Sequence, residues 1–294
     1  MDKLAKLFED IGKLWTHYSG PYFTGIRNTL ILAVAATVAG CLIGLICGIL
    51  NTIPCSKADH PIKRFFLGAI RVLIRVYVEV FRGTPMVLQA VFIYYGLPYF
   101  TDGAIAFKGL SGIWIAALLV VSINTGAYMA ESVRGGIISI DPGQTEGAKA
   151  IGMTHYQTMV NVIMPQALRN IIPQIGNNFI INIKDTSVMF IIGFMEFFAV
   201  HRTIVGNNFL YFPSAVIEMV GYLTLTLLAS FGLRAIEKRL DGDSSYQLAH
   251  TDQLTMAAGT YSHPDRSSPF EEKSTDQIKK TRLSLKHGRM RGDR

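Results

Sequence analysis

Charged residues are scarce in this chain. Asp, Glu, Lys and Arg make up 17% of its 294 residues, whereas 50% of the residues are hydrophobic. A soluble globular chain carries about a quarter charged residues, so this composition argues against a soluble protein. The scarcity of charge leaves apolar runs of roughly the 20 residues that a membrane-spanning helix needs.

Cysteine and the sequence motifs of common enzymes are also rare or missing. Cys41, Cys47 and Cys55 suggest no disulfide pairing, and we interpret them as packing residues or reduced thiols. The chain contains no Gly-x-x-x-x-Gly-Lys-Ser/Thr phosphate loop, no His-Glu-x-x-His metal motif and no nucleophile elbow. We therefore expect no enzyme, no metal site and no cofactor bound by this chain.

Five apolar segments are expected to span a membrane. They are residues 28–50, the apolar part of 84–100 with the helix before it, 112–133, a segment within 170–198, and 214–233. Charges interrupt the second and the fourth of these segments. Because helices satisfy their own backbone hydrogen bonds in lipid, the sequence predicts an all-α, polytopic membrane helix bundle.

Lysine and arginine collect on one side of these segments. They follow the first, third and fifth segments, whereas the loops 101–111 and 201–213 carry only Lys108 and Arg202. Basic loops favour the cytoplasmic side. The sequence thus predicts an N-terminus outside and a C-terminus in the cytoplasm.

Two regions flank the expected membrane domain, residues 21–241. In residues 1–20, apolar and charged residues alternate at helical spacing, which predicts an amphipathic helix lying in the membrane interface or packed on the bundle. Residues 242–294 are polar and basic without periodicity, which predicts a disordered cytoplasmic tail. Such a tail can contact anionic membrane lipids, and nothing beyond its charge suggests nucleic-acid binding.

Residues 141–165 form a polar stretch between two apolar segments, on the predicted cytoplasmic side. Asp141 is a favourable N-cap for a first short helix. Gly152 supplies a left-handed residue that ends this helix. Thr154 begins a second helix, which we expect to stop near Pro165. A rigid helix–turn–helix exceeds what a connection needs, and it suits the groove of another protein.

The same stretch resembles the cytoplasmic signature of ABC importer permeases. That signature reads Glu-Ala-Ala, three residues, Gly, nine residues, Ile, any residue, Leu-Pro. The matching residues here are Glu146-Gly147-Ala148, Gly152 and Val162-Ile163-Met164-Pro165. Gly147 replaces an alanine, which loosens a helix by up to about 1 kcal/mol.

Further motifs resemble the polar amino-acid permeases of that family, the histidine, glutamine and arginine types. They are residues 77–85 (YVEVFRGTP) with Gln89 and 94–98 (YYGLP), 126–136 (GAYMAESVRGG) and 184–187 (KDTS). The resemblance covers roughly residues 20–240. It implies a permease in a bacterial inner or plasma membrane, which alternates its access and works with a second permease chain, identical or similar.

The resemblance also implies partners for this chain. Two ATPase subunits would bind ATP and Mg, and an extracytoplasmic solute-binding protein would deliver an amino acid. The contact with the ATPase is expected at Glu146, Gly147, Ala148, Gly152 and Pro165. We interpret Glu79, Arg82, Gly83, Thr84 and Pro85 as architectural, because proline disfavours helix at the preceding residue.

Polar residues at membrane depth are the candidates for lining a substrate path. They are Gln89, Asn124, Tyr128, Asn178, Asp185, Thr186 and Ser187. Each has an alternative role, in which it satisfies a neighbour or the dimer interface. Pro173 and the KDTS motif further predict a discontinuous helix, whose second half Asp185, Thr186 or Ser187 would cap.

A self-contained, ion-coupled secondary transporter or channel is the alternative function. It would also place polar residues inside the membrane. It would not need the helix pair, and five spans without an internal repeat are few for such a protein.

Overall fold

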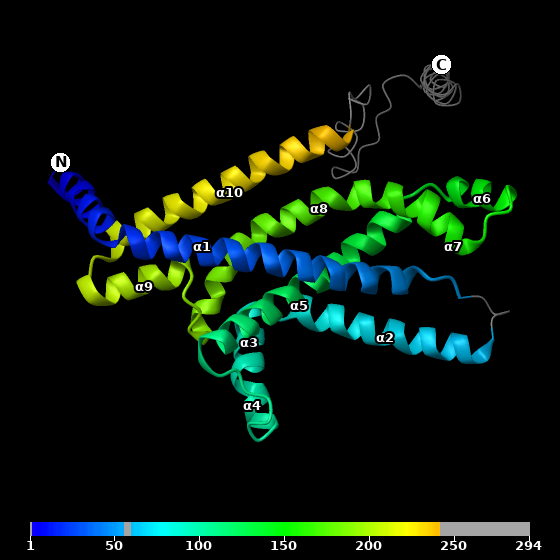
Figure 1. The fold of residues 1–294 in the computed structure, drawn as a ribbon, viewed down its shortest axis with the longest axis horizontal. Helices are drawn as coiled ribbons and strands as arrows, with labels where there is room; N and C mark the ends of the chain where they lie inside the picture. Colours follow the sequence, from blue (N-terminus) through cyan, green and yellow to red (C-terminus); the bar gives the residue numbers. More distant parts are fainter. Residues whose placement is uncertain (1, 56–59, 242–294) are drawn as a thin grey trace, which may run out of the picture. The chain divides into compact units, whose positions relative to one another are not determined.

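The computed structural model describes residues 2–55 and 60–241, and Figure 1 shows their helices. In chain order these are α1 (Asp2–Thr52), α2 (Pro61–Gly83), α3 (Met86–Val91), the π-helix η1 (Phe92–Gly96), α4 (Leu97–Phe100), α5 (Gly109–Ile138), α6 (Pro142–Ala150), α7 (His155–Thr158), the π-helix η2 (Met159–Ile163), α8 (Met164–Asp185), the 3₁₀ helix η3 (Thr186–Ile192), α9 (Phe197–Asn208) and α10 (Tyr211–Asp241). The described residues include no β-strand. The predicted tail, residues 242–294, lies outside them.

The predicted helical bundle is confirmed. Three helices, α1, α5 and α10, are each long and apolar enough to cross a membrane. A fourth candidate is bent by 51° where His155–Ile192 meets Phe197–Asn208, and the remaining expected segment, Met86–Phe100, is a shorter apolar helix. The two segments in which charges interrupt the sequence are thus the bent one and the short one.

Helix α1 joins the expected amphipathic helix directly to the first span. Only Tyr18 leaves helical geometry, with φ −117° and ψ 15°, close to the expected boundary at residue 20. Leu14 is buried in a cluster with Tyr22, whereas Leu4 and Phe8 are exposed. One side of this segment therefore packs on the bundle, and the other side remains available to a membrane interface.

Small residues bring α1 and α5 into close contact. Gly40, Gly44 and Gly48 recur every fourth residue of α1 and face α5. A Cβ atom at Gly40 would lie 2.6 Å from Cβ of Thr125, and one at Gly48 would lie 2.5 Å from Cγ1 of Val133. Lipid offers no hydrophobic drive for helix association, so such close backbone packing contributes much of the attraction.

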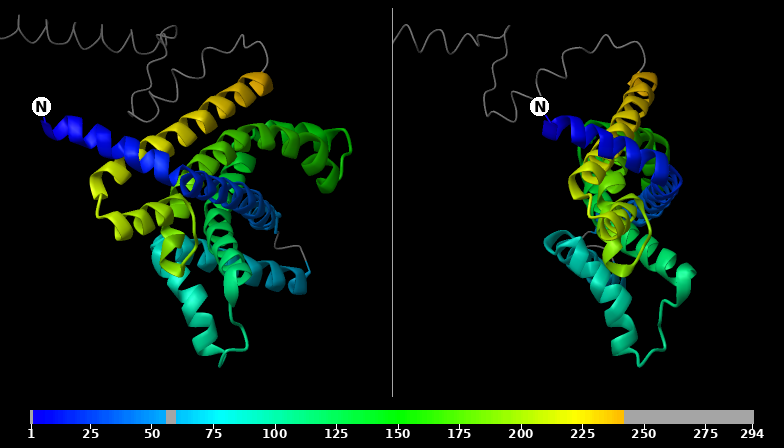
Figure 2. Two further views of the ribbon diagram at one scale, coloured as in Figure 1. Left: turned by 60° about the vertical axis from the view of Figure 1, so that its left-hand side comes forward. Right: turned by 90° about the vertical axis from the view of Figure 1, so that its left-hand side faces the viewer.

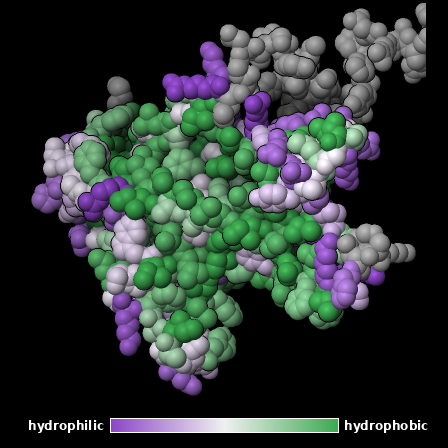
Figure 3. Space-filling view, turned by 45° about the vertical axis from the view of Figure 1, so that its right-hand side comes forward, coloured by the Kyte–Doolittle hydropathy of each residue, from purple (hydrophilic) through white to green (hydrophobic). Residues whose placement is uncertain are grey.

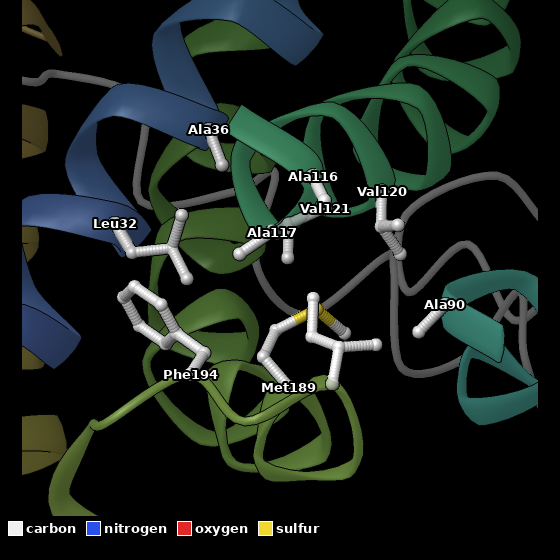
Figure 4. Packing of buried hydrophobic residues seen from close by; sticks show 10 residues of the cluster. Leu32, Ala36, Ala90, Ala116, Ala117, Val120, Val121, Met189 and Phe194 are labelled. Atoms are coloured by element: carbon white, nitrogen blue, oxygen red, sulfur yellow. The ribbon is translucent and has the colours of Figure 1, made fainter. Parts of the chain in front are cut away.

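A hydrophobic core lies where α1, α3, α5 and η3 meet (Figure 4). Leu32 of α1 and Phe194, just after η3, lie on one side of it, and Met189 of η3 fills the space toward Ala90 of α3. The alanines and valines of α5 between them are fully buried. This core fixes η3 against the membrane-spanning helices.

Much of the remaining surface is apolar. Figure 3 shows one face on which hydrophobic side chains form a broad area, with hydrophilic ones at its margins. Phe65 and Phe66 of α2 are exposed, as are Leu228 and Phe231 of α10. Such extensive apolar exposure is expected of helices that face lipid or another protein chain.

The second short helix does not end at Pro165, contrary to the expectation. Helix α7 passes into η2 and then into α8, which holds Pro165 in its first turn. A proline ring inside an α-helix would clash with the carbonyl four residues earlier. The wider π turn, in which the Met164 amide donates to the carbonyl of Met159, lets the helix continue.

The break in the fourth span lies later than the KDTS motif. Helix α8 runs through Pro173 and passes directly into η3, with Asp185 still in helical geometry and making no side-chain cap. Thr186 donates its hydroxyl to the carbonyl of Ile183 instead. The prediction that Asp185, Thr186 or Ser187 caps a second half is therefore wrong, because the backbone does not begin a new helix there.

Glu196 is the residue that caps the second half of this span. The chain turns at Gly193, whose φ is +82°. The Glu196 carboxylate then accepts hydrogen bonds from the amides of Phe198 at 2.8 Å and Ala199 at 2.7 Å, at the first turn of α9. A discontinuous helix was predicted correctly, but the four residues 193–196, not the polar motif, interrupt it; Gly193 is left-handed and Glu196 is extended.

Candidate functional site

The bend between α2 and α3 is fixed by a buried amide. Thr84, the residue before Pro85, is extended with φ −121° and ψ 146°, as a pre-proline residue is expected to be. Nε2 of Gln89 donates to the carbonyls of Phe81 and Thr84 and to the Thr84 hydroxyl, each at 2.9 Å. Nδ2 of Asn124 donates to Oε1 of Gln89 at 3.0 Å. Gln89 thus satisfies its neighbours, which was the alternative to a role in lining the path.

A cavity of about 340 Å³ lies beside this bend. Its lining comprises Thr84, Pro85, Met86, Asn124, Thr125, Tyr128, Asn178, Ile181, Asn182 and Asp185. The structure therefore brings together four of the expected path residues, from α5 and α8. It does not bring Gln89, Thr186 or Ser187 to the cavity wall.

Asn182 joins three helices at the wall of the cavity. Its Nδ2 donates to Oγ1 of Thr37 in α1 at 2.8 Å, and its Oδ1 accepts from Oγ1 of Thr125 in α5 at 3.1 Å. Asn178, one turn earlier in α8, donates to the carbonyl of Gln174 at 2.9 Å. The donors of these amides are satisfied, so the wall is polar without an unpaired donor on either side chain.

An ion pair lies next to the cavity. Arg82 at the end of α2 pairs with Glu131 of α5, and its guanidinium carbon lies 5.2 Å from the ring centroid of Tyr128. Arg82 and Glu131 also border a second hollow of about 270 Å³ between the end of α1, α2 and α5. Further charged residues around that hollow are Arg71, Arg75, Glu79 and Arg134.

These contacts refine the interpretation of the FRGTP motif. Thr84 and Pro85 form the bend, while Gly83 is the last residue of α2. Arg82 and Glu79 border the charged hollow instead. The motif combines an architectural part with a charged part that contacts α5.

The helix pair at residues 141–165 has the expected helix starts and the expected glycine turn. Oδ1 of Asp141 accepts from the amide of Gly143 at 2.7 Å. Gly152 is left-handed, with φ +84°, and no atom lies within 4 Å of a Cβ placed there. Thr154 and Gln157 form both halves of a capping box. The N-caps and the glycine turn are thus confirmed, while the end at Pro165 is not.

The outer surface of the helix pair is exposed and partly apolar. Glu146 and Gly147 are exposed, whereas Ala148 is buried against the rest of the chain. Ile151 is 78% exposed and Tyr156 is 75% exposed. Figure 1 shows α6 and α7 together at the far end of α8 from α9. Ile151 was not among the residues expected at the partner contact, and its exposure adds it to the candidates on this surface.

The chain matches, over residues 62–242, the family described as the inner membrane component of binding-protein-dependent transport systems. The chain belongs to this family. The chain is 37% identical over 217 residues to the glutamine transport system permease protein of Escherichia coli strain K12. The alignment covers 74% of this chain and 91% of that relative. The chain is also 34% identical over 202 residues to a probable amino-acid permease protein of Bacillus subtilis strain 168, covering 69% of this chain and 83% of the relative.

Solved structures share the fold of this chain. A crystal structure of an amino acid ABC transporter with histidines superposes with a TM-score of 0.66 at 32% identity, covering 76% of this chain and 96% of the other. The inward-facing methionine ABC transporter gives a TM-score of 0.58 at 17% identity, covering 74% and 95% of the two chains. The second likeness concerns the fold alone.

Three buried or paired acids of this chain were not among the expected site residues. They are Glu131, which pairs with Arg82, Glu196, which caps α9, and Glu218, which is 7% exposed within α10. An ionisable residue inside an apolar segment is a functional candidate by its cost alone. Each of the three lies in such a segment, so its position in the sequence could have marked it as a candidate.

Proposed function

We propose that this chain is the membrane-spanning permease subunit of an ATP-driven amino-acid importer, and that it forms the translocation path by alternating access. The helix pair α6–α7 carries the proposal. A connection between two apolar segments that is capped at both helix starts and presents Ile151 and Tyr156 to the outside is built for a partner.

That partner is an ATPase subunit, which binds ATP and Mg. The chain itself has no phosphate loop. Glu146 and Gly147 face outward beside Ile151 and supply polar and close contacts, while Ala148 anchors the helix to the permease. Gly152 sets the angle between α6 and α7. Pro165 acts less directly, because it begins α8 and links the pair to the span.

The substrate class is an amino acid. This assignment is supported by the names of the relatives and by the cavity beside the α2–α3 bend. Asn124, Tyr128 and Asn178 offer polar groups to a zwitterion, and the carboxylate of Asp185 suits its ammonium group. Gln89 and Thr186 support the path from behind, by holding the backbone around the bend and at the start of η3, and Ser187 follows Thr186 in η3.

The complete importer needs further chains. A second permease chain, identical or similar, would cover apolar surface such as that of α10, and a solute-binding protein would deliver the amino acid from outside. The distribution of Lys and Arg supports an N-terminus outside, a C-terminus inside, and a cytoplasmic position for α6–α7. The inner or plasma membrane of a bacterium is the expected location, with lipid around the bundle.

One charge reversal and one backbone change on the helix pair test the proposal. The permease is reconstituted in vesicles with its ATPase and binding protein, and amino-acid uptake and ATP hydrolysis are measured together. Glu146→Arg and Gly152→Pro should insert normally but reduce uptake at least about tenfold per ATP hydrolysed, a loss of about 1.4 kcal/mol in coupling. Lys108→Glu, an exposed charge reversal in the loop 101–111, is the matched control and should leave uptake unchanged.

Two outcomes contradict the proposal in different ways. Normal uptake in both helix-pair variants would remove the coupling role of α6–α7. Uptake by the permease alone, driven by an ion gradient without the ATPase, would instead favour the secondary-transporter alternative.

A further inference from the structure

A buried cluster of polar side chains holds α9 against α1 and α10, away from the cavity beside the α2–α3 bend. Its members are Tyr22, His201, Ser214 and Glu218. Tyr22 and Ser214 have no exposed surface, His201 is 2% exposed and Glu218 is 7% exposed. Figures 1 and 2 show α9 beside the N-terminal part of α1, near the start of α10. The proposed transport path uses none of these residues.

The four side chains form one chain of contacts across three helices. The Tyr22 hydroxyl lies 2.9 Å from Oγ of Ser214, and that oxygen lies 2.8 Å from Nδ1 of His201. Nδ1 of His201 is also 3.5 Å from Oε2 of Glu218. Oε1 of Glu218 is buried and has no hydrogen-bond partner among the described residues. The cluster is therefore complete except at one oxygen of Glu218.

A second buried acid lies nearby. Glu196 has no exposed surface, and its oxygens accept from the amides of Phe198 and Ala199 and from the Tyr222 hydroxyl at 2.8 Å. Tyr222 and Glu218 are four residues apart on α10 and so share a helix face. Glu196 thus lies close to Glu218.

These contacts determine which number of protons on the His201–Glu218 pair has the lowest free energy. With one proton, the pair is neutral overall, either as acid and imidazole or as carboxylate and imidazolium. Without it, Glu218 would be a buried carboxylate with an unpaired oxygen, which is costly at this depth. With two protons, the imidazolium loses its partner charge.

We propose that His201 and Glu218 form a proton-binding site, and that the single proton they share fastens α9 to α10. Proton loss would leave the buried Glu218 carboxylate without a proton between it and His201 and with its other oxygen unpaired, so the fastening weakens as the pH rises. Because α9 begins directly after the 51° bend of the fourth span, the same proton biases the position of that bend. The identity of the compartment that supplies the proton rests on the proposed topology; the site itself does not.

The other titratable groups around the pair are few. Tyr22 approaches from α1, Glu196 and the exposed Arg202 lie on α9, and Tyr222 lies on α10. The ring of Tyr211 lies 5.4 Å from that of His201. Tyrosines remain neutral well above neutral pH, and the Glu196 carboxyl group is occupied by three hydrogen-bond donors. We assign a pH-dependent change at this site to the His201–Glu218 pair as a unit.

Hydrogen exchange of the full-length chain in lipid vesicles tests the site. Amide protection of α9, normalised to peptides of α5, should fall at least about tenfold in wild type as the pH rises past the point of proton loss. Glu218→Gln keeps the neutral shape of the acid and should retain full protection at every pH. Glu237→Gln, which changes an acid near the other end of α10, should behave as wild type.

A second variant protects the test against a failure of Glu218→Gln to fold. In His201→Gln, Glu218 titrates without the imidazole, so the midpoint of the α9 transition must move from the wild-type value. The proposal would be overturned if the protection of α9 in wild type did not depend on pH. It would also be overturned if His201→Gln kept the wild-type midpoint. The measurement needs no ATPase and no substrate, so a failure of the importer assignment would leave its result intact, and the reverse also holds.

Discussion

Two bends interrupt the helices of the membrane domain, and different chemistry holds each of them. At Thr84–Pro85, a proline imposes the extended residue, and the neutral amide of Gln89 donates to the carbonyls of Phe81 and Thr84 that precede the proline. At Gly193–Glu196, a left-handed glycine turns the chain, and an acidic side chain caps the next helix. The first bend borders the cavity, and the second leads to the buried acids of α9 and α10.

The difference teaches where this protein tolerates charge. The clamp at the first bend is neutral, so it binds backbone without adding a charge to the cavity, whose wall already includes Asp185. An ionisable clamp is costly in the membrane, and it persists only where several donors surround it. Asn28 and Thr29 of α1 also fasten the second bend, by bonds to Met195 and Phe197. Asn124 of α5 fastens the first bend, by bonds to Phe81 and Gln89, so tertiary contacts contribute to both bends.

Removing the acid at the second bend should have the largest effect. Glu196→Ala leaves two helix amides and the Tyr222 hydroxyl without their buried acceptor, and we expect a loss of at least about 3 kcal/mol in the free energy of unfolding. Thermal unfolding in detergent measures it. Glu196→Gln keeps an acceptor and should lose less; an equal loss in both variants would contradict the capping role.

Removing the amide at the first bend should have a smaller effect. Gln89→Leu deletes the donor to the Phe81 and Thr84 carbonyls and the acceptor for Asn124, for an expected loss of about 1–2 kcal/mol. Combined with Asn124→Ala, the two changes should be less than additive, because they share a hydrogen bond. Leu88→Ala, an exposed neighbour, is the control. Strict additivity would show that the two amides act independently.

The turn glycine of the second bend should contribute least. A Cβ at Gly193 would meet only Cδ1 of Ile113 at 3.9 Å, so Gly193→Ala has space but places alanine at φ +82°. We expect a loss of about 1 kcal/mol, the conformational cost of a left-handed L-residue. The same unfolding experiment measures it, with Gly206→Ala in the last turn of α9 as a comparison. A loss as large as that of Glu196→Ala would mean that the turn, not the cap, holds the bend.

Local features of the helix pair and the first bend could be predicted from the sequence. Asp141, Gly152 and the Thr154–Gln157 box act through neighbours one to three residues away, so their geometry is encoded where they stand. The extended Thr84 follows in the same way from Pro85. The end of the second short helix could not be predicted, because a π turn absorbs Pro165 and no residue type marks such a turn.

The candidate site was predictable in part. Asn124, Tyr128, Asn178 and Asp185 were recognised as polar residues at membrane depth, and they meet at one cavity. Their partners were not predictable, since Asn182 joins residues 145 positions apart in the chain through its bond to Thr37. Gln89 has the same polarity as the others and yet supports a bend, so polarity alone does not separate a lining residue from a clamp.

Residues close together in the chain were enough to establish a helical membrane protein with a capped helix pair, because apolar run length and helix capping are local properties. The packing of the helices was needed to show which polar residues line the cavity, where the fourth span bends, and that Glu196, His201 and Glu218 share one buried region. Those outcomes depend on which helices lie side by side, and no local pattern of residues specifies the distance between them.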